Sequence, residues 1–258
     1  CAHKGDFGRI TIMAGSENFT GAAYISTEAA VRSGAGLVTL CTKKSILDIL
    51  KSKLVEAMSM SYEDIAFEGV ISNSDSIAIG PGMGNNELTL KCVKNILSKN
   101  GCPVVLDADA LNVLKGNLEL LKNSKRKIII TPHMGEMSRL TGVDVESLIE
   151  NRIGIAVNFA KEYKVIVLLK GYNTIITDGN EVYVNSTGNS KMASGGMGDT
   201  LTGIIASFIG QGYEPFKATI VSAYIHGYCG DILSKEMFCV NASHVIEKIP
   251  YVVEYLVK

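Results

Sequence analysis

The chain has 258 residues, of which 47% are hydrophobic and 20% charged, a composition typical of a globular protein. Its 25 basic and 26 acidic residues leave a formal charge of −1, which provides no general attraction to nucleic acid or to an anionic membrane. No apolar run approaches the roughly 18 residues that a membrane span needs, and no signal peptide is recognised. We therefore expect neither a nucleic-acid partner nor a membrane partner.

Short and almost wholly apolar runs alternate with longer helical patterns over the first two thirds of the chain. The apolar runs predict parallel strands covered on both faces, and they lie at 9–15, 37–41, 76–80, 103–109, 127–131 and 165–171. The helical patterns between them lie at 20–34, 44–52, 86–99, 134–140 and 145–162. This alternation predicts an α/β fold of three layers, α/β/α, with a mostly parallel central sheet and helices on both faces.

The pattern changes after residue 171. Residues 174–186 predict a β-hairpin, with Asp178-Gly179 as its turn signal. Three helical patterns complete the chain, at 198–211, 215–235 and 242–257. Since no linker, low-complexity tract or internal repeat interrupts the sequence, residues 1–258 are predicted to form a single domain.

Six cysteines are spread along the chain without any CxxC pair. Three of them, Cys41, Cys102 and Cys229, lie in or beside apolar segments. Buried free thiols explain this distribution better than a disulfide framework or a zinc site. Together with the composition, this cysteine pattern predicts a reducing, cytoplasmic location.

A glycine-rich segment, "SGGMGD" at 194–199, leads into the apolar helical pattern of 198–211 and overlaps its first two residues. Gly195, Gly196 and Gly198 carry no side-chain bulk, so a ligand can approach the main chain closely. The free N–H groups and the positive dipole end of the helix would then form an anion site. An ordinary glycine-rich turn capped by Asp199 explains the same spacing, and the spacing alone leaves both interpretations open.

Asp199 adds a chemical constraint to this loop. A carboxylate at a helix N-terminus is stabilised in its ionised form, so the pKa of Asp199 is predicted to be low. A group with a low pKa is a poor base towards a free alcohol. It becomes effective when the alcohol loses its proton as a phosphoryl group bonds to the oxygen. The loop and the carboxylate together favour transfer of phosphate to a hydroxyl.

The segment "SGGMGDTLTGIIASFIGQG" at 194–212 resembles the signature of the ADP/ATP-dependent NAD(P)H-hydrate dehydratases, a family of the ribokinase-like superfamily. The resemblance covers nearly the whole chain in the same order. It includes the segments at 3–40, 77–84 ("IAIGPGMG"), 104–112 ("VVLDADALN"), 130–142 ("ITPHMGEMSRLTG") and 167–179 ("VLLKGYNTIITDG").

The resemblance implies a ribokinase-like fold and a repair activity. Such an enzyme phosphorylates the hydroxyl of the S form of NADH or NADPH hydrate, and loss of phosphate then restores NAD(P)H. The implied co-substrate is ADP, converted to AMP, or ATP, converted to ADP, with Mg2+ as cofactor. The family also implies a fused or separate NAD(P)H-hydrate epimerase as partner, and a homo-oligomer, a tetramer.

The resemblance also implies roles for particular residues. Asp199 is the implied catalytic base. The implied nucleotide-binding residues are Lys170, Gly171, Tyr172, Asn173, Thr174, Gly195, Gly196 and Gly198. The hydrate is expected to contact Ala22, Gly82, Gly84, His133 and Asp199.

Several of these residues also have an ordinary structural explanation. A lysine that ends a strand, as Lys170 does, is often simply solvated, and a lone histidine such as His133 is commonly structural. His226 lies within a helical pattern and is predicted to be a core residue. Asp109 is a candidate helix cap, whereas Asp107 or Glu136 is a candidate water-mediated contact for magnesium. No direct metal ligand is predicted.

Two other functions compete with the dehydratase. A small-molecule kinase of the same superfamily, acting on a vitamin precursor of the hydroxymethylpyrimidine or hydroxyethylthiazole type, would share the sheet and the glycine loop. A non-catalytic nucleotide-binding regulator would keep the fold but not Asp199. The segments "GSENFTGAA" and "TPHMGE" resemble the dehydratases better than the kinases, and Asp199 is present.

Overall fold

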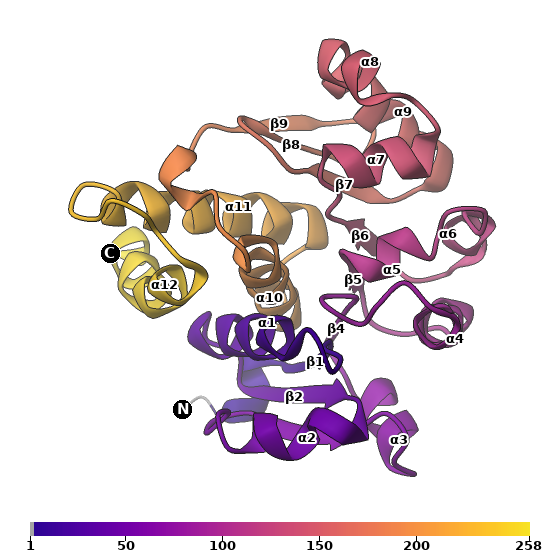
Figure 1. Cartoon of the computed structure of the whole chain (residues 1–258), viewed down its shortest axis with the longest axis vertical. Helices are drawn as coiled ribbons and strands as arrows, with labels where there is room; N and C mark the ends of the chain where they lie inside the picture. Colours follow the sequence, from indigo (N-terminus) through magenta and orange to yellow (C-terminus); the bar gives the residue numbers. More distant parts are fainter. Residues whose placement is uncertain (1–2) are drawn as a thin grey trace.

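The computed structural model describes residues 3–258 as a single nine-stranded sheet with helices on both sides (Figure 1). The strand order is β3-β2-β1-β4-β5-β6-β7-β8-β9. In this order, all neighbouring pairs from β3 through β7 are parallel. The pairs β7–β8 and β8–β9 are antiparallel. The strands are β1 (Arg9–Met13), β2 (Leu37–Thr42), β3 (Met58–Ser61), β4 (Ser76–Ile79), β5 (Val104–Leu106), β6 (Ile128–Ile130), β7 (Ile166–Leu169), β8 (Thr174–Thr177) and β9 (Val182–Asn185).

Two groups of helices cover the two faces of the sheet. One face carries α1 (Thr20–Arg32), α2 (Lys44–Lys51), α10 (Met197–Gly210), α11 (Pro215–Leu233) and α12 (Ala242–Val257). The other face carries α3 (Phe67–Ser72), α4 (Glu87–Ser98), α5 (Asp109–Asn112), α6 (Glu119–Asn123), α7 (Met134–Thr141), α8 (Val145–Glu150) and α9 (Arg152–Tyr163). Two short 3-10 helices lie at Lys4–Phe7 and Ser190–Met192. Figure 1 shows α10, α11 and α12 on the opposite side of the sheet from α4, α5 and α6.

The apolar strands explain why both faces are covered. In β4, Ile77 and Ile79 are buried in the core beneath α3 and α4, while Ala78 is buried in the core beneath α1 and α10. Successive side chains of a strand point to opposite faces, so a continuous apolar run requires helices on both. The three-layer α/β/α prediction is confirmed.

Three details of the predicted elements were wrong. The edge strand β3, with the sequence "MSMS", was missed because its short and half-polar run lacks the apolar signal of the central strands. The helix expected over 145–162 is two helices, because Asn151 leaves helical geometry and its side chain accepts a hydrogen bond from Gly154 N. The helices α3, α5 and α6 were missed, because they are too short to show a helical periodicity in the sequence.

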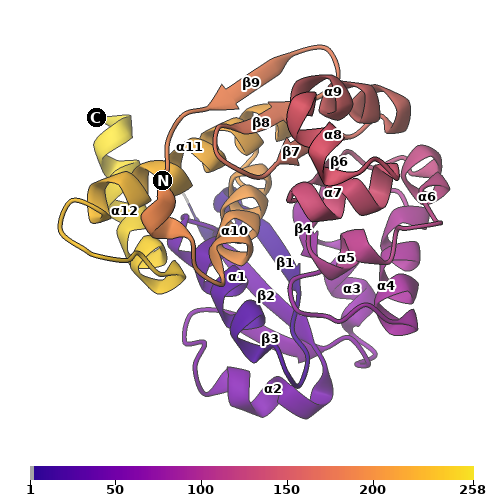
Figure 2. The same cartoon turned by 45° about the horizontal axis from the view of Figure 1, so that its top comes forward.

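The hairpin expected over 174–186 is formed by β8 and β9. Asp178 Oδ1 accepts hydrogen bonds from the N–H groups of Asn180 (2.8 Å) and Glu181 (2.9 Å), and Gly179 has a φ of +96°. This turn chemistry is what the Asp-Gly signal predicts. In Figure 2 the chain leaves β9 and descends along the α11–α12 side before it enters α10.

The cysteines of the described region are unpaired thiols. Cys41 and Cys229 are buried, as expected, whereas Cys92 and Cys102 are partly buried and Cys239 is exposed. None of the helices within residues 3–258 combines the length and the apolar character needed to cross a bilayer.

Arg126 is a buried charge that holds the carboxyl end of α4. Its Nε donates to the carbonyls of Ile96 and Lys99 (both 2.9 Å), and its Nη atoms donate to the carbonyls of Cys102 (2.9 Å) and Asn100 (3.3 Å). A cation at this position satisfies carbonyls that the end of a helix leaves free, and it complements the helix dipole.

Replacing Arg126 with methionine is expected to lower the free energy of unfolding by about 3 kcal/mol, because several buried carbonyls lose a charged donor. Urea denaturation measures this change. The matched control is Lys125→Met at the neighbouring exposed position, which should change stability by less than about 0.5 kcal/mol. Equal stabilities of the two variants would show that Arg126 does not support α4.

The order of the strands creates a topological switch point at the carboxyl ends of β1 and β4. The chain winds from β1 outward to β3, then returns to place β4 on the other side of β1. Ligands of open α/β sheets bind at such a switch point. The helices α1 and α10 lie beside it and pack closely: a Cβ atom at Gly203 would collide with the carbonyl oxygen of Ser26.

Candidate active site

The predicted hydrate-binding residues Ala22, Gly82 and Gly84 lie at the switch point. Gly82 packs against Ala22 at the start of α1, and its carbonyl accepts a hydrogen bond from Ser16 Oγ (2.7 Å). Gly84 donates its N–H to Asp109 Oδ2 (2.7 Å). The loops after β1, β4 and β5 are thereby brought together, as their positions after buried strands predicted.

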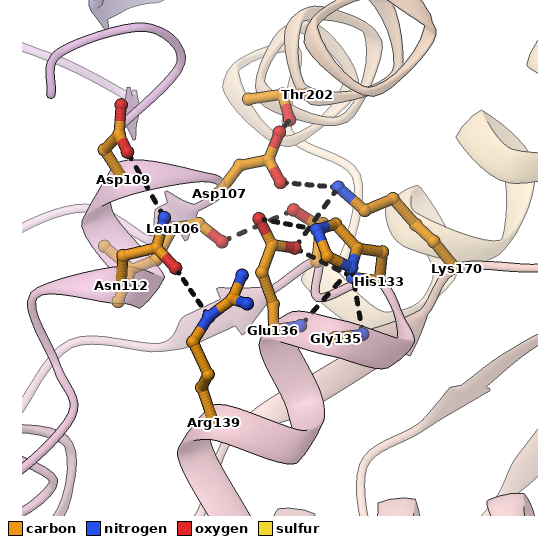
Figure 3. A network of polar contacts seen from close by, with 11 residues as sticks. Leu106, Asp107, Asp109, Asn112, His133, Gly135, Glu136, Arg139, Lys170 and Thr202 are labelled. Carbon is orange, nitrogen blue, oxygen red and sulfur yellow. Dashed lines mark hydrogen bonds and ion pairs between the residues drawn. The ribbon is translucent and has the colours of Figure 1, made fainter. Parts of the chain in front are cut away.

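Asp109 is held by these loops and does not cap α5. The residue at the N-cap of α5 is Ala108, and Asp109 lies in the first turn. Its Oδ1 accepts from Asn112 Nδ2 (3.2 Å), and Asn112 Oδ1 in turn accepts from Arg139 Nε (3.1 Å), as Figure 3 shows. The capping role considered for Asp109 was therefore wrong, and the carboxylate instead orders the "GPGMG" loop.

A buried ion pair lies beside the start of α10. Lys170 Nζ is 2.8 Å from Asp107 Oδ1 and 3.8 Å from Glu136 Oε2, while Thr202 Oγ1 donates to Asp107 Oδ2 at 2.8 Å (Figure 3). Lys170 is therefore paired and largely buried, in contrast to the simply solvated lysine considered as an alternative.

The ion pair controls the charge of both its members. Burial alone would raise the pKa of Asp107, but the Lys170 ammonium and the hydrogen bond from Thr202 hold it below its ordinary value. Burial alone would lower the pKa of Lys170, but Asp107 and Glu136 outweigh it and keep the ammonium charged. The site thus contains a fixed positive charge next to a fixed negative one.

Gly198 lets this pair approach α10. A Cβ atom at this position would lie 3.3 Å from Lys170 Nζ and 3.8 Å from Asp107 Oδ2. The glycine loop therefore places the first turn of α10 directly against the ammonium. The Lys170 ammonium and the positive end of the 14-residue helix α10 therefore both make the electrostatic potential positive in the same region.

The low pKa predicted for Asp199 was wrong. Burial and the neighbouring charge of Asp107 raise its pKa from 3.8 to about 6, although Lys170 acts in the opposite direction. The sequence showed the helix end but not the second carboxylate that faces it. A carboxyl group with a pKa near 6 is mostly ionised at neutral pH and is a better proton acceptor than an ordinary aspartate.

His133 has a structural role as the N-cap of α7. The ring Nδ1 of His133 accepts hydrogen bonds from the backbone N–H groups of Gly135 (3.0 Å) and Glu136 (3.3 Å). The backbone N–H of His133 donates to Glu136 Oε2 (2.8 Å). This is a capping box. Burial lowers the pKa of His133, so the ring is neutral, with Nδ1 as acceptor and the proton on Nε2. Nε2–H lies 3.5 Å from Glu136 Oε1 and remains available to a substrate.

A cavity of about 430 Å³ opens between the β7–β8 loop, the segment after β9 and helix α11. Six of the residues predicted to bind nucleotide line it: Lys170, Gly171, Tyr172, Asn173, Thr174 and Gly198. Gly195 and Gly196 lie on the short stretch between two further lining residues, Ala193 and Met197. The volume is within the range of cavities that hold small ligands. Ala22, Gly82, Gly84 and His133 do not line this cavity.

The sequence reasoning missed part of the cavity wall. Residues 185–190 also line the cavity. This segment is held in place by Asp231, whose carboxylate accepts hydrogen bonds from Gly188 N (2.9 Å) and Asn189 Nδ2 (2.8 Å). His226 and Gly227 of α11 line the cavity as well. His226 was expected in the core, but it is only partly buried and its Nε2 has no hydrogen-bond partner among the described residues. Burial lowers its pKa to about 4, so the ring is uncharged.

Within the described residues, no group of three or more His, Cys, Asp or Glu side chains converges to hold a metal ion. Asp107 is already engaged by Lys170 and Thr202. The site therefore does not provide a protein cage for a metal. Its charges fit a magnesium ion that arrives on a nucleotide's phosphates and keeps several waters.

The fold and this site define a ribokinase-like protein, in which a glycine loop and a carboxylate at a helix start adjoin a nucleotide-sized cavity. The sequence profile of the NAD(P)H-hydrate dehydratases matches residues 10–251. The chain belongs to this family.

Individual relatives agree with this assignment. The chain is 38% identical over 98% of its length to the bifunctional NAD(P)H-hydrate repair enzyme Nnr of Moorella thermoacetica, of which it covers 51%. The ADP-dependent (S)-NAD(P)H-hydrate dehydratase of Staphylococcus aureus is 36% identical, with 99% of this chain and 92% of the relative covered. The chain thus spans about half the length of the bifunctional relatives that it matches.

Solved structures separate the two competing enzyme classes. The ADP/ATP-dependent NAD(P)H-hydrate dehydratase of Bacillus subtilis, co-crystallised with ATP and Mg2+, superposes with a TM-score of 0.86 at 30% identity, covering 98% of this chain and 91% of that one. A hydroxyethylthiazole kinase from Pyrococcus horikoshii covers 96% of this chain and 91% of its own at a TM-score of 0.63, but with 16% identity. The likeness to the kinase shows the fold alone.

Proposed function

We propose that the chain is an NAD(P)H-hydrate dehydratase domain, formed by residues 1–258, that uses ADP or ATP to restore NAD(P)H from the S form of its hydrate. The observation that carries the proposal is the position of Asp199. The carboxylate lies in the first turn of α10, next to the cavity-lining Gly198, and the charges of the Lys170–Asp107 pair act on it. A phosphate donor and a hydroxyl acceptor can meet at this point.

The phosphoryl-transfer step needs one proton acceptor and a site for phosphate. As the hydrate's hydroxyl oxygen bonds to the terminal phosphorus of the nucleotide, its proton passes to Asp199 and the bond to the leaving nucleotide breaks. AMP leaves from ADP, or ADP from ATP. The C–O bond of the phosphorylated hydrate then breaks, and phosphate departs with the proton that the adjacent ring carbon loses as the double bond is restored.

Lys170 and the first turn of α10 stabilise the charge on the transferred phosphoryl group. Lys170 through Thr174 and Gly195, Gly196 and Gly198 hold the nucleotide, and Ala22, Gly82, Gly84 and His133 hold the hydrate. Bound Mg2+ would neutralise phosphate charge, held by the phosphates and by water because residues 3–258 offer no cage for it.

The pKa of Asp199 predicts the pH dependence of the activity. Only the ionised carboxylate accepts the proton, so kcat/KM is expected to rise with pH through about 6 and to level off above 7. Initial rates between pH 5 and 8, with the unfolding free energy measured over the same range, test this. A flat kcat/KM over a stably folded range would contradict the role of Asp199.

The defining experiment incubates the protein with NADH hydrate, Mg2+ and either ADP or ATP. Recovery of the absorbance of the reduced nicotinamide should require nucleotide, and the nucleotide that supports it identifies the phosphate donor. Protein that binds nucleotide but restores no absorbance would move the assignment to a kinase of a vitamin precursor.

Three further features belong to the same proposal. The relatives named bifunctional support an NAD(P)H-hydrate epimerase as a fused or separate partner. The unpaired thiols of the described region support a reducing compartment, the cytoplasm. A homo-tetramer is the proposed assembly, which light scattering of the full chain would test.

A further inference from the structure

Arg152, the first residue of α9, lies behind the β7–β8 loop that forms one wall of the cavity. Its Nη1 donates to the carbonyl of Tyr172 (2.8 Å), and its Nη2 donates to the carbonyl of Asn173 (3.3 Å). All residues from Lys170 to Thr174 line the cavity, whereas Arg152 does not. One guanidinium therefore contacts two successive carbonyls of the cavity wall without itself lining the cavity.

These two bonds fix an unusual loop conformation. Asn173 has a φ of +53°, in the left-handed region that side chains other than glycine seldom adopt. Asparagine tolerates this region better than most residues other than glycine, and the surrounding hydrogen bonds hold the loop in it. Besides the bonds from Arg152, the loop is closed by Thr174 Oγ1, which donates to the carbonyl of Gly171 (2.9 Å).

The direction of the carbonyls decides what the loop presents to the cavity. In a trans peptide, the carbonyl of one residue and the N–H of the next point in opposite directions. Since the Tyr172 carbonyl points to Arg152, the N–H of Asn173 points away from it, towards the cavity side. Within residues 3–258, the N–H groups of Gly171, Tyr172 and Asn173 have no backbone acceptor. These three residues are exposed, so their N–H groups are open to water or to a ligand in the cavity.

We propose that Arg152 is a positioning residue for the nucleotide, holding the 171–174 loop so that its backbone N–H groups face the ligand. The inference rests on the proposed function, which assigns the cavity to ADP or ATP. Arg152 itself does not touch the nucleotide. Its planar fork matches two adjacent carbonyls, a geometry that the single ammonium of lysine cannot reproduce.

The test compares the full-length wild type with Arg152→Lys and Arg152→Gln. Isothermal titration gives the Kd for ADP and ATP, and steady-state rates give kcat and both KM values. Both variants should weaken nucleotide binding by about tenfold or more, since charge-assisted hydrogen bonds are lost. The kcat at saturating nucleotide and the KM for the hydrate should stay within about threefold. Methylguanidinium added to Arg152→Gln should restore part of the affinity.

Arg32→Lys is the matched control, because the exposed Arg32 side chain pairs, among residues 3–258, with Glu28 of its own helix α1 and with no residue of the cavity. It should leave all constants unchanged. Wild-type affinity in Arg152→Lys would overturn the proposal by showing that charge alone suffices. A loss of kcat without a change in nucleotide Kd would also overturn it. Wild-type protein that binds neither nucleotide would instead refute the assigned function of the cavity, and this inference with it.

Discussion

Replacing Asp199 with asparagine is expected to lower kcat by roughly a hundred- to ten-thousandfold, the contribution of a positioned general base. Asparagine has nearly the same shape as aspartate but cannot take up the proton of the hydrate's hydroxyl. The Kd for ADP should remain within about threefold of wild type, because the cavity is lined by other residues. Single-turnover rates and isothermal titration measure the two quantities separately.

The same substitution should also stabilise the fold. The pKa of Asp199 is raised from 3.8 to about 6 in the folded protein, so the unfolded chain ionises more readily than the folded one. The free energy of unfolding therefore falls as pH rises through this interval. Asparagine avoids that cost, so the free energy of unfolding at pH 7 should rise by up to about 3 kcal/mol. Asp48→Asn, at an exposed position on α2, is the control and should change neither quantity. An Asp199→Asn enzyme with wild-type kcat would remove Asp199 from the mechanism.

Replacing Lys170 with methionine is expected to lower the free energy of unfolding by about 3 to 5 kcal/mol at pH 7, because the buried carboxylate of Asp107 loses its partner. In the wild type, the lowered pKa of Asp107 contributes stability that is present above pH 3.8 and lost as pH falls further. Without the ammonium, burial dominates and raises this pKa. The stability difference between the two proteins should therefore grow as pH rises from about 4 to 7.

Two comparisons isolate the ion pair in this experiment. The double variant Lys170→Met/Asp107→Asn should regain most of the lost stability, since no unpaired charge is left buried. Lys99→Met removes an exposed ion pair with Glu68 and should cost less than about 1 kcal/mol. A Lys170→Met protein as stable as Lys99→Met at pH 7 would show that Asp107 is not stabilised by the pairing.

The sequence was sufficient for the features that depend on local pattern. The parallel strands β1, β2, β4, β5, β6 and β7 are continuous apolar runs, and the hairpin carries its Asp-Gly turn. Because the predicted site residues follow those strands or begin helices, their place at the carboxyl edge of the sheet was also predictable. The edge strand β3 lacks such a pattern and was missed.

The features that depend on contacts distant in sequence could not be predicted. The pKa of Asp199 depends on Asp107, which lies 92 positions earlier in the chain and reaches it only because α10 packs over β5. His133 was considered as a substrate contact or a structural residue, and its capping box became visible only with the geometry of α7. Arg152 has no motif of its own, and only its hydrogen bonds to the Tyr172 and Asn173 carbonyls single it out.

The close packing of α1 against α10 has a consequence for how the protein is made. The two helices meet at Ser26 and Gly203 and share one apolar core, yet they come from the first and the last third of the chain. During synthesis, α1 emerges long before the helix that covers it. Until about residue 210 has left the ribosome, the apolar face of α1 lacks its main partner, and the residues that surround Asp199 are not yet assembled.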